Sequence, residues 1–91
     1  LASVYLPNTF TPNDDGLNDV FTPQILDIES YEFLIFNKWG ELVFSSAELG
    51  EGWDGNYKGE PAKSEVYVYT LVALTKRGQV KEYKGHVTLI R

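Results

Sequence analysis

Hydrophobic residues along the 91-residue chain gather in short segments that are separated by polar turns. The two clearest segments are 31–37 and 66–74, which are rich in aromatic and β-branched residues and, apart from Glu32, apolar on both faces. This pattern is typical of central strands in a packed sheet. The segments 42–45 and 80–91 each follow one of them after a short turn. Because no segment has a helical period, the pattern predicts antiparallel strands joined by tight turns.

Shorter segments complete the predicted set of strands. Residues 2–6 and 19–22 are β-prone and each stops before a proline, which predicts two short strands, the first of them at a sheet edge. The segment 24–30 lacks a clear period, and we expect it to bend with its apolar side chains turned inward, namely Ile25, Leu26 and Ile28. With a turn about every ten residues, the chain is predicted to form one all-β domain over residues 1–91, an antiparallel β-sandwich of about 6–8 strands.

Turn-forming residues mark the joints between these strands. Residues 37–41 predict a hairpin turn in which Gly40 takes a positive φ, and residues 53–56 predict a tight turn around an Asp-Gly pair. Residues 76–79 close the last hairpin. Gly85 interrupts the last predicted strand, and there we expect a β-bulge or a bend.

The segment 8–21 contains too many Pro, Asn, Asp and Gly residues to continue as a helix or a strand. Asn and Asp side chains readily form hydrogen bonds with their own backbone, which predicts a compact loop at the surface. We expect Phe10 and Phe21 to anchor this loop in the core, and Gly16 to turn it.

The same loop suggests a calcium site, because hard cations bind clustered oxygen atoms on turns that contain glycine. With Gly16 at the sixth position of an EF-hand loop, Asn13, Asp15 and Asp19 fall at ligand positions. The first and twelfth positions, where Asp and Glu are required, both fall on threonine. Two interpretations stay open, an irregular calcium loop and a loop that needs no ion, and in either the loop can belong to a surface that a partner contacts. Apart from this calcium candidate, no cofactor is expected.

The acidic balance of the chain limits its partners. A formal net charge of -5 argues against nucleic acid, which favours clustered Lys and Arg. The first 32 residues carry no basic side chain, whereas five of the eight basic residues come late, at Lys76, Arg77, Lys81, Lys84 and Arg91. This asymmetry either orients the domain against a partner or reflects a solvated strand face.

Other classes of protein also lack support. There is no cysteine for a disulfide or a thiolate site, and no apolar run reaches the roughly 20 residues that a membrane helix needs. His86 is the single histidine, so we expect a residue on a strand surface and no enzyme. The chain begins at Leu1 and contains no methionine, from which we expect a piece of a longer protein.

Trp39 and Trp53 both lie in predicted turns, which permits two interpretations. A pair of exposed, coplanar rings would form a platform for stacking a sugar. Alternatively, each ring folds back over an end of the sandwich and gives its N–H to a partner, which is the arrangement that we expect because Trp is rarely left fully exposed.

Four parts of the chain together resemble the gliding-motility-associated C-terminal domain, the type B C-terminal sorting domain of the type IX secretion system of Bacteroidota. They are NTFTPNDDGLNDVF (8–21), IFNKWGELVF (35–44), the set WDG (53–55), GEP (59–61) and VYVY (66–69), and GHVTLIR (85–91). The residues that carry the resemblance are Phe10, Pro12, Gly16, Asn18, Phe21, Asn37, Trp39, Gly40, Trp53, Asp54, Gly55, Gly85 and Arg91. In one departure, the chain has Glu65 where the family usually has a glycine before the Val-Tyr strand, so we expect an ordinary backbone conformation there.

The resemblance implies an immunoglobulin-like sandwich that serves as a folded, non-catalytic address label. It implies recognition by the type IX secretion machinery, together with a dedicated outer-membrane partner. The cargo protein would then travel through the periplasm and across the outer membrane to the cell surface or the medium.

Two hypotheses about function follow from the sequence. In the first, the domain is a recognition module for secretion that docks a partner through a strand edge or a loop, and the last strand is the expected edge. In the second, it is a carbohydrate-binding or adhesive module that uses Trp39, Trp53 and nearby tyrosines.

Overall fold

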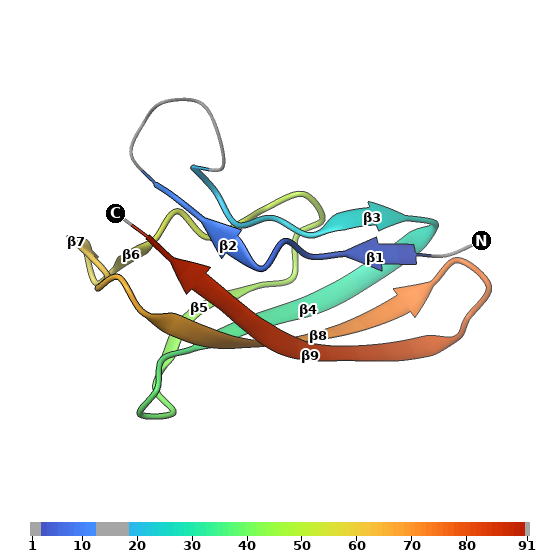
Figure 1. Ribbon diagram of the computed structural model, residues 1–91. Helices are drawn as coiled ribbons and strands as arrows, with labels where there is room; N and C mark the ends of the chain where they lie inside the picture. The colour runs from blue at the N-terminus through green and yellow to red at the C-terminus, as the bar shows by residue number, and fades with distance from the viewer. Residues whose placement is uncertain (1–2, 13–18, 91) are drawn as a thin grey trace.

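The computed structural model describes residues 3–12 and 19–90, and these residues contain nine strands and no helix (Figure 1). The strands are β1 (Ser3–Tyr5), β2 (Thr9–Phe10), β3 (Gln24–Leu26), β4 (Ile28–Phe36), β5 (Leu42–Ser46), β6 (Asn56–Tyr57), β7 (Glu60–Pro61), β8 (Val66–Thr75) and β9 (Val80–Leu89). The predicted all-β fold is confirmed. There are more strands than expected because β2, β6 and β7 have only two residues each.

A five-stranded sheet with the order β2-β9-β8-β4-β5 is the larger layer. The strands β4, β8 and β9 form its middle and pair antiparallel. The two-sided apolar pattern of the segments that became β4 and β8 predicted their central place. The strand β2 is the exception, because it runs parallel to β9 and pairs only with Thr88 and Leu89. The sheet is therefore mixed at this one end.

The second layer is thinner. It contains the two-stranded sheet of β1 and β3, which pair antiparallel and lie above the large sheet in Figure 1. The core lies between the layers, and its largest fully buried side chains are Trp53, Phe10, Phe21, Phe33, Ile35, Leu71, Leu89 and Val87. Burial of this many large apolar side chains supplies the main driving force for folding. The predicted sandwich is confirmed.

The hairpin turns follow the predictions from the sequence. Gly40 has a φ of 80° and Gly55 a φ of 85°, a backbone conformation that residues with a Cβ rarely adopt. In the turn between β8 and β9, the Gly78 N–H donates to the Thr75 carbonyl at 2.9 Å. Glu65 is not among the residues with positive φ, so the expected ordinary conformation at the start of β8 is confirmed.

Two expectations about short segments were wrong. Residues 19–22 do not form a strand; Phe21 alone makes an isolated bridge with Trp53, and Pro23 lacks the N–H that would extend the pairing. Leu26 is 57% exposed instead of turned inward. It belongs to β3, where Ile25 pairs with Val4 and points to the core, so the alternation of a strand turns Leu26 outward.

The expected bulge at Gly85 was also wrong. The pairing of β8 with β9 runs in one register from Val66↔Thr88 to Leu74↔Val80, and Gly85 lies directly opposite Tyr69. A Cβ at Gly85 would come within 2.6 Å of the Tyr69 hydroxyl oxygen and 2.8 Å of its Cζ. The glycine therefore makes room for an aromatic ring that packs across the strand pair.

We expect Gly85→Ala to destabilise the domain by about 1–3 kcal/mol, as overpacked sites usually do. The measurement is the free energy of unfolding in urea, repeated in a Tyr69→Val background. In that background the added methyl group finds space, so the same substitution should cost less than about 0.5 kcal/mol. An equal cost in both backgrounds would show that the Tyr69 ring is not the reason for the glycine.

Candidate recognition surfaces

The predicted anchors of the opening loop lie in the core. Phe10 is 1% exposed and Phe21 is fully buried, and their ring centroids are 5.7 Å apart. Trp53 joins them, with its ring 5.5 Å from Phe10 and two backbone hydrogen bonds to Phe21 at 2.8 and 3.0 Å. Residues that lie more than 40 positions apart in the sequence thus form one aromatic cluster.

The loop between these anchors falls mostly outside the described residues. Pro12 and Asp19 are half-buried. Asn13, Asp15, Gly16, Asn18 and, at the other end of the chain, Arg91 are not described, so their predicted roles stay predictions. Within residues 3–12 and 19–90, no group of three or more His, Cys, Asp or Glu residues could hold a metal ion. The calcium loop and the ion-free loop both stay open.

The turn at Trp53 folds back into the molecule. The indole N–H donates to the Asn56 carbonyl at 2.9 Å, and the ring packs edge-on against Tyr67 with centroids 4.9 Å apart. The Asp54 carboxylate caps the turn by accepting the Asn56 N–H at 3.0 Å, and the positive φ of Gly55 closes it. The fold-back that we expected for Trp53 is confirmed, so this ring cannot take part in a sugar-stacking pair.

The turn at Trp39 has the opposite outcome. The Asn37 side-chain oxygen accepts the N–H groups of Trp39 at 2.9 Å and Glu41 at 3.0 Å, which fixes the turn at its tip. The Trp39 ring is 76% exposed, and Lys38 Nζ lies 5.4 Å from its centroid. The expectation that this ring folds back was wrong, because the turn projects beyond the end of the sheet and leaves no layer for the ring to cover.

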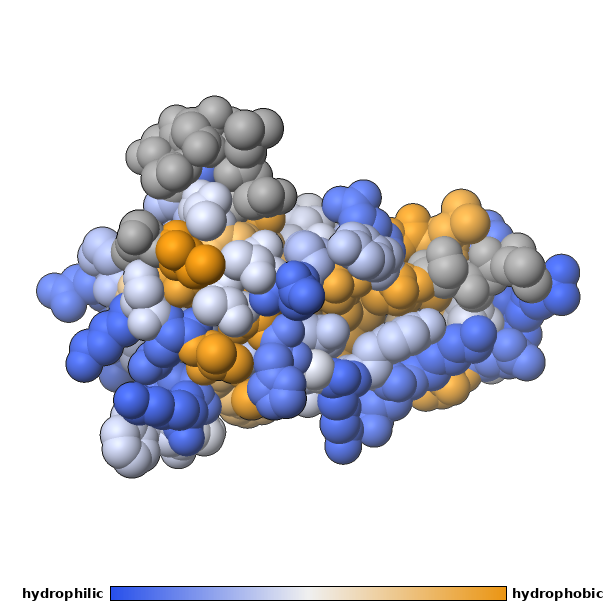
Figure 2. Space-filling model, viewed as in Figure 1, coloured by the Kyte–Doolittle hydropathy of each residue, from blue (hydrophilic) through white to orange (hydrophobic). Residues whose placement is uncertain are grey.

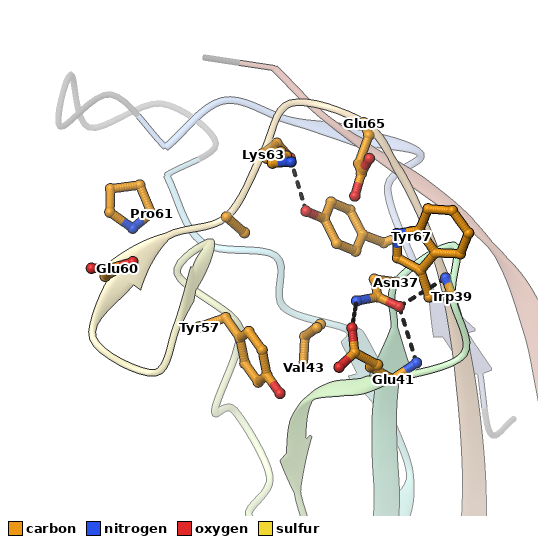
Figure 3. Close-up of a pocket in the computed structure, with 11 residues that line it drawn as sticks. Asn37, Trp39, Glu41, Val43, Tyr57, Glu60, Pro61, Lys63, Glu65 and Tyr67 are labelled. Carbon is orange, nitrogen blue, oxygen red and sulfur yellow. Dashed lines mark hydrogen bonds between the residues drawn. The ribbon is translucent and has the colours of Figure 1, made fainter.

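A cleft of about 290 Å³ lies beside this turn (Figure 3). Its walls come from Asn37, Trp39, Glu41, Val43, Tyr57, Glu60, Pro61, Ala62, Lys63, Glu65 and Tyr67. Glu65 forms an ion pair with Lys38 at 3.6 Å, and the Asn37 amide donates to the Glu41 carboxylate at 2.9 Å. The Tyr67 hydroxyl donates to the Lys63 carbonyl at 2.8 Å. Within the cleft, the Asn37 and Glu41 side chains are thus bound to each other and the Tyr67 hydroxyl is bound to the backbone.

Sequence reasoning missed this cleft. Its two walls come from the β4–β5 turn and from the segment 57–67, and no local pattern shows that these segments meet. The exposed position of Trp39 was missed for the same reason.

The outer side of β9 is open over most of its length. No described strand pairs with this side from Val80 to Val87, because β2 covers only Thr88 and Leu89. The expectation that the last strand is a sheet edge holds for its first eight residues and is wrong for its end. His86 lies on the exposed surface of this strand, as predicted.

Two tyrosines near the core have perturbed acidity. Burial raises the pKa of Tyr69, whose ring packs against Gly85. Burial is also the main cause that raises the pKa of Tyr31, whose hydroxyl donates to the carbonyls of Glu48 at 3.0 Å and Glu51 at 3.3 Å. Both phenols therefore stay protonated at neutral pH and serve as packing groups.

The chain matches the family model of the CHU_C type IX secretion signal domain over residues 4–89. It belongs to this family. No curated protein and no solved structure matches it. The match covers nearly the whole chain, including the buried cluster and both hairpins, and it agrees with the resemblance seen in the sequence.

Membership in the family defines the role of this type IX secretion signal domain. It is a C-terminal sorting signal that the type IX machinery recognises, and its cargo is exported across the outer membrane to the cell surface or the medium. No helix in the described part of the chain is long and apolar enough to span a membrane.

Proposed function

We propose that this domain is a non-catalytic address label, read in its folded state by a dedicated outer-membrane partner of the type IX machinery. The observation that carries the proposal is the meeting of the family's signature segments in one buried cluster, with Phe10 and Trp53 at 5.5 Å. Because these signature residues are buried in the core, the label exists only when the domain is folded. The partner must then read surfaces that the fold creates.

The non-catalytic part of this proposal rests on the family, which is one of secretion signal domains. The described residues contain no group of three or more His, Cys, Asp or Glu residues that could hold a metal ion. What they offer a partner is an open strand edge along β9 and a cleft beside Trp39. Both are features of a binding module. The sugar-binding alternative loses its platform because Trp53 is 1% exposed.

The dedicated partner can be tested by genetics. The domain is fused to a reporter with a periplasmic leader in a host that has the type IX system, and outer-membrane proteins encoded with that system are deleted one at a time. We expect one deletion to stop export of this reporter while a second reporter, which carries a type A sorting domain, still reaches the outside. If every single deletion affects both reporters alike, the dedicated partner is contradicted.

We propose further that the domain folds without a structural ion. The cluster of Phe10, Phe21 and Trp53 joins the ends of the opening loop through packing and backbone hydrogen bonds, which require no metal. We expect excess chelator to change the melting temperature by less than about 1 °C, because removing a bound ion lowers stability only if the native state binds it. A drop of several degrees that calcium restores would establish the calcium loop instead.

A further inference from the structure

We propose that the open side of β9 is the docking site for an extended segment of the export partner. This segment adds to the large sheet as one more strand, and it alternates apolar with acidic residues. The inference rests on the proposed function, because it names the surface and the chemistry by which the partner reads the folded label. Three observations carry it: backbone groups that no described strand pairs, partly buried apolar side chains, and local positive charge.

The first observation is the direction of the backbone groups of β9. The N–H groups of Thr88 and Ile90 donate toward β2, to the carbonyls of Asn8 and Phe10, whereas the Leu89 N–H donates to Glu65 on the other side. Backbone groups alternate along a strand, and the register with β8 contains no bulge. The N–H and C=O groups of four residues therefore face the open side, namely Val80, Glu82, Lys84 and His86.

This edge has the features of a template for pairing. Sheet edges are usually protected by a proline, a bulge, a short length or charged side chains, and here Lys81 and Lys84 disfavour pairing with an identical, equally basic edge. The open stretch of β9 has neither proline nor bulge, and its eight residues extend for about 27 Å. Main-chain hydrogen bonds to such an edge supply affinity in strand addition, and the flanking side chains supply specificity.

The second observation is that the chain does not itself cover the open side of β9. Continued backward from Thr9, the parallel pairing of β2 would place residues 1–8 beside the open stretch of β9. Pro7 lies in that segment and cannot donate, and β1 pairs instead with β3 in the other layer. No described strand therefore pairs with this side of β9 from Val80 to Val87.

Apolar side chains lie beside the open side of β9. Val4 and Leu6 from the upper layer and Tyr83 from β9 are only partly buried, and all three pack against the core. Figure 2, in the same view as Figure 1, shows hydrophobic surface between β1 and β9. An added strand would place every second side chain over this surface, so those side chains should be apolar.

The third observation is electrostatic and concerns the net charge of the partner's segment. Side chains alternate along β9, so Lys81 lies on the same side as Tyr83 and Lys84 lies on the opposite side. Between residues 76 and 89 the chain has four basic residues, Lys76, Arg77, Lys81 and Lys84, and one acidic residue, Glu82. This part of the molecule is positive although the whole chain carries -5. Glu82 is paired with Lys84 at 3.5 Å in an exposed ion pair. A negatively charged segment is therefore favoured, while a second copy of β9 is disfavoured by repulsion between like charges.

A direct test uses the intact 91-residue chain and a nine-residue peptide of alternating valine and glutamate, at about 1 mM. We expect amide exchange at Glu82, Lys84 and His86 to slow by about tenfold, as for a ligand at ten times its Kd. Tyr83 and Gly85, whose N–H groups face β8, serve as internal controls. The same peptide with lysine in place of glutamate should have no effect. Equal protection by both peptides, or none by either, would overturn the proposal.

Export of the reporter fusion tests the same site in the cell. His86→Pro removes an outward N–H and no bond of the β8–β9 ladder, and Lys81→Glu with Lys84→Glu reverses the local charge. We expect both variants to reduce export by at least about tenfold, a loss of about 1.4 kcal/mol of recognition. Lys58→Glu alone makes half of this charge change at a residue that belongs neither to β9 nor to the cleft beside Trp39, and it should leave export unchanged. Thermal unfolding of each purified variant shows whether it is folded.

The outcomes separate this inference from the proposed function. Normal export of the folded edge variants would contradict strand addition at β9 and leave the address label intact. Failure of the unaltered domain to export its reporter would contradict the proposed function itself. A dimer in solution that His86→Pro dissolves would show that the occupant is a second copy, which also contradicts the proposal.

Discussion

A chain that stops at residue 84 is expected not to fold. The removed segment includes Val87 and Leu89, which are fully buried, and among the described strands it alone pairs with β2. Loss of each such side chain costs about 2–5 kcal/mol, so the total approaches the 5–15 kcal/mol of stability that natural domains have. The measurement is far-UV circular dichroism with thermal unfolding.

A chain that stops after Leu89 is the matched control for this truncation. It keeps both buried side chains and the residues Thr88 and Leu89 that pair with β2. It loses Arg91 and Ile90, which is 47% exposed and whose N–H donates to the Phe10 carbonyl at 3.0 Å. We expect this control to unfold cooperatively, close to the full chain. Cooperative unfolding of the chain that ends at residue 84 would contradict the structure. Because that truncation unfolds the label, its failure in export would not locate the signal, and point variants along β9 are needed instead.

Trp53→Ala and Trp39→Ala are expected to differ widely although both residues lie in glycine-containing turns. Trp53 is 1% exposed and packs against Phe10 and Tyr67, so its truncation should cost about 3–5 kcal/mol. Trp39 is 76% exposed, so its truncation should change stability by no more than about 0.5 kcal/mol. Urea unfolding of the two variants measures the difference. Similar costs for both would show that the burial of Trp53 in the aromatic cluster does not stabilise the domain.

The fold was predictable where local pattern decides it. The segments that became β4 and β8 are apolar on both faces, which identifies central strands without further information. The glycines at positions 40, 55 and 78 each marked a turn, because a positive φ at these sites favours a residue without a Cβ.

The remaining errors share one physical cause, which is that the decisive partner lies far away in the sequence. The sequence predicted a bulge at Gly85, whereas the residue that explains the glycine is Tyr69 on the neighbouring strand. The parallel pairing of β2 with β9 joins residues nearly 80 positions apart, and no turn connects them. Trp39 and Trp53 have similar local sequences, and only the position of each turn relative to the second layer separates them.

The candidate site was predictable to a smaller extent. The sequence pointed to the last strand as an edge and to its excess of basic residues, and both features survive in the open side of β9. It did not show where along the strand the edge is open, because that depends on Pro7 diverting β1 to the other layer. The cleft beside Trp39 needed the three-dimensional structure for the same reason.

The most direct test of the central claim, that this chain is a sufficient and folded sorting signal, is one export measurement. Residues 1–91 are fused behind a reporter with a periplasmic leader, and the reporter is quantified in the periplasm, on the cell surface and in the medium. The measurement compares a host that has the type IX system with an isogenic strain that lacks its outer-membrane pore. We expect the fusion to reach the surface or the medium only when the pore is present, and we expect the Trp53→Ala fusion to stay in the periplasm. Periplasmic retention of the unaltered fusion in the competent host would show that this chain is not a sufficient sorting signal.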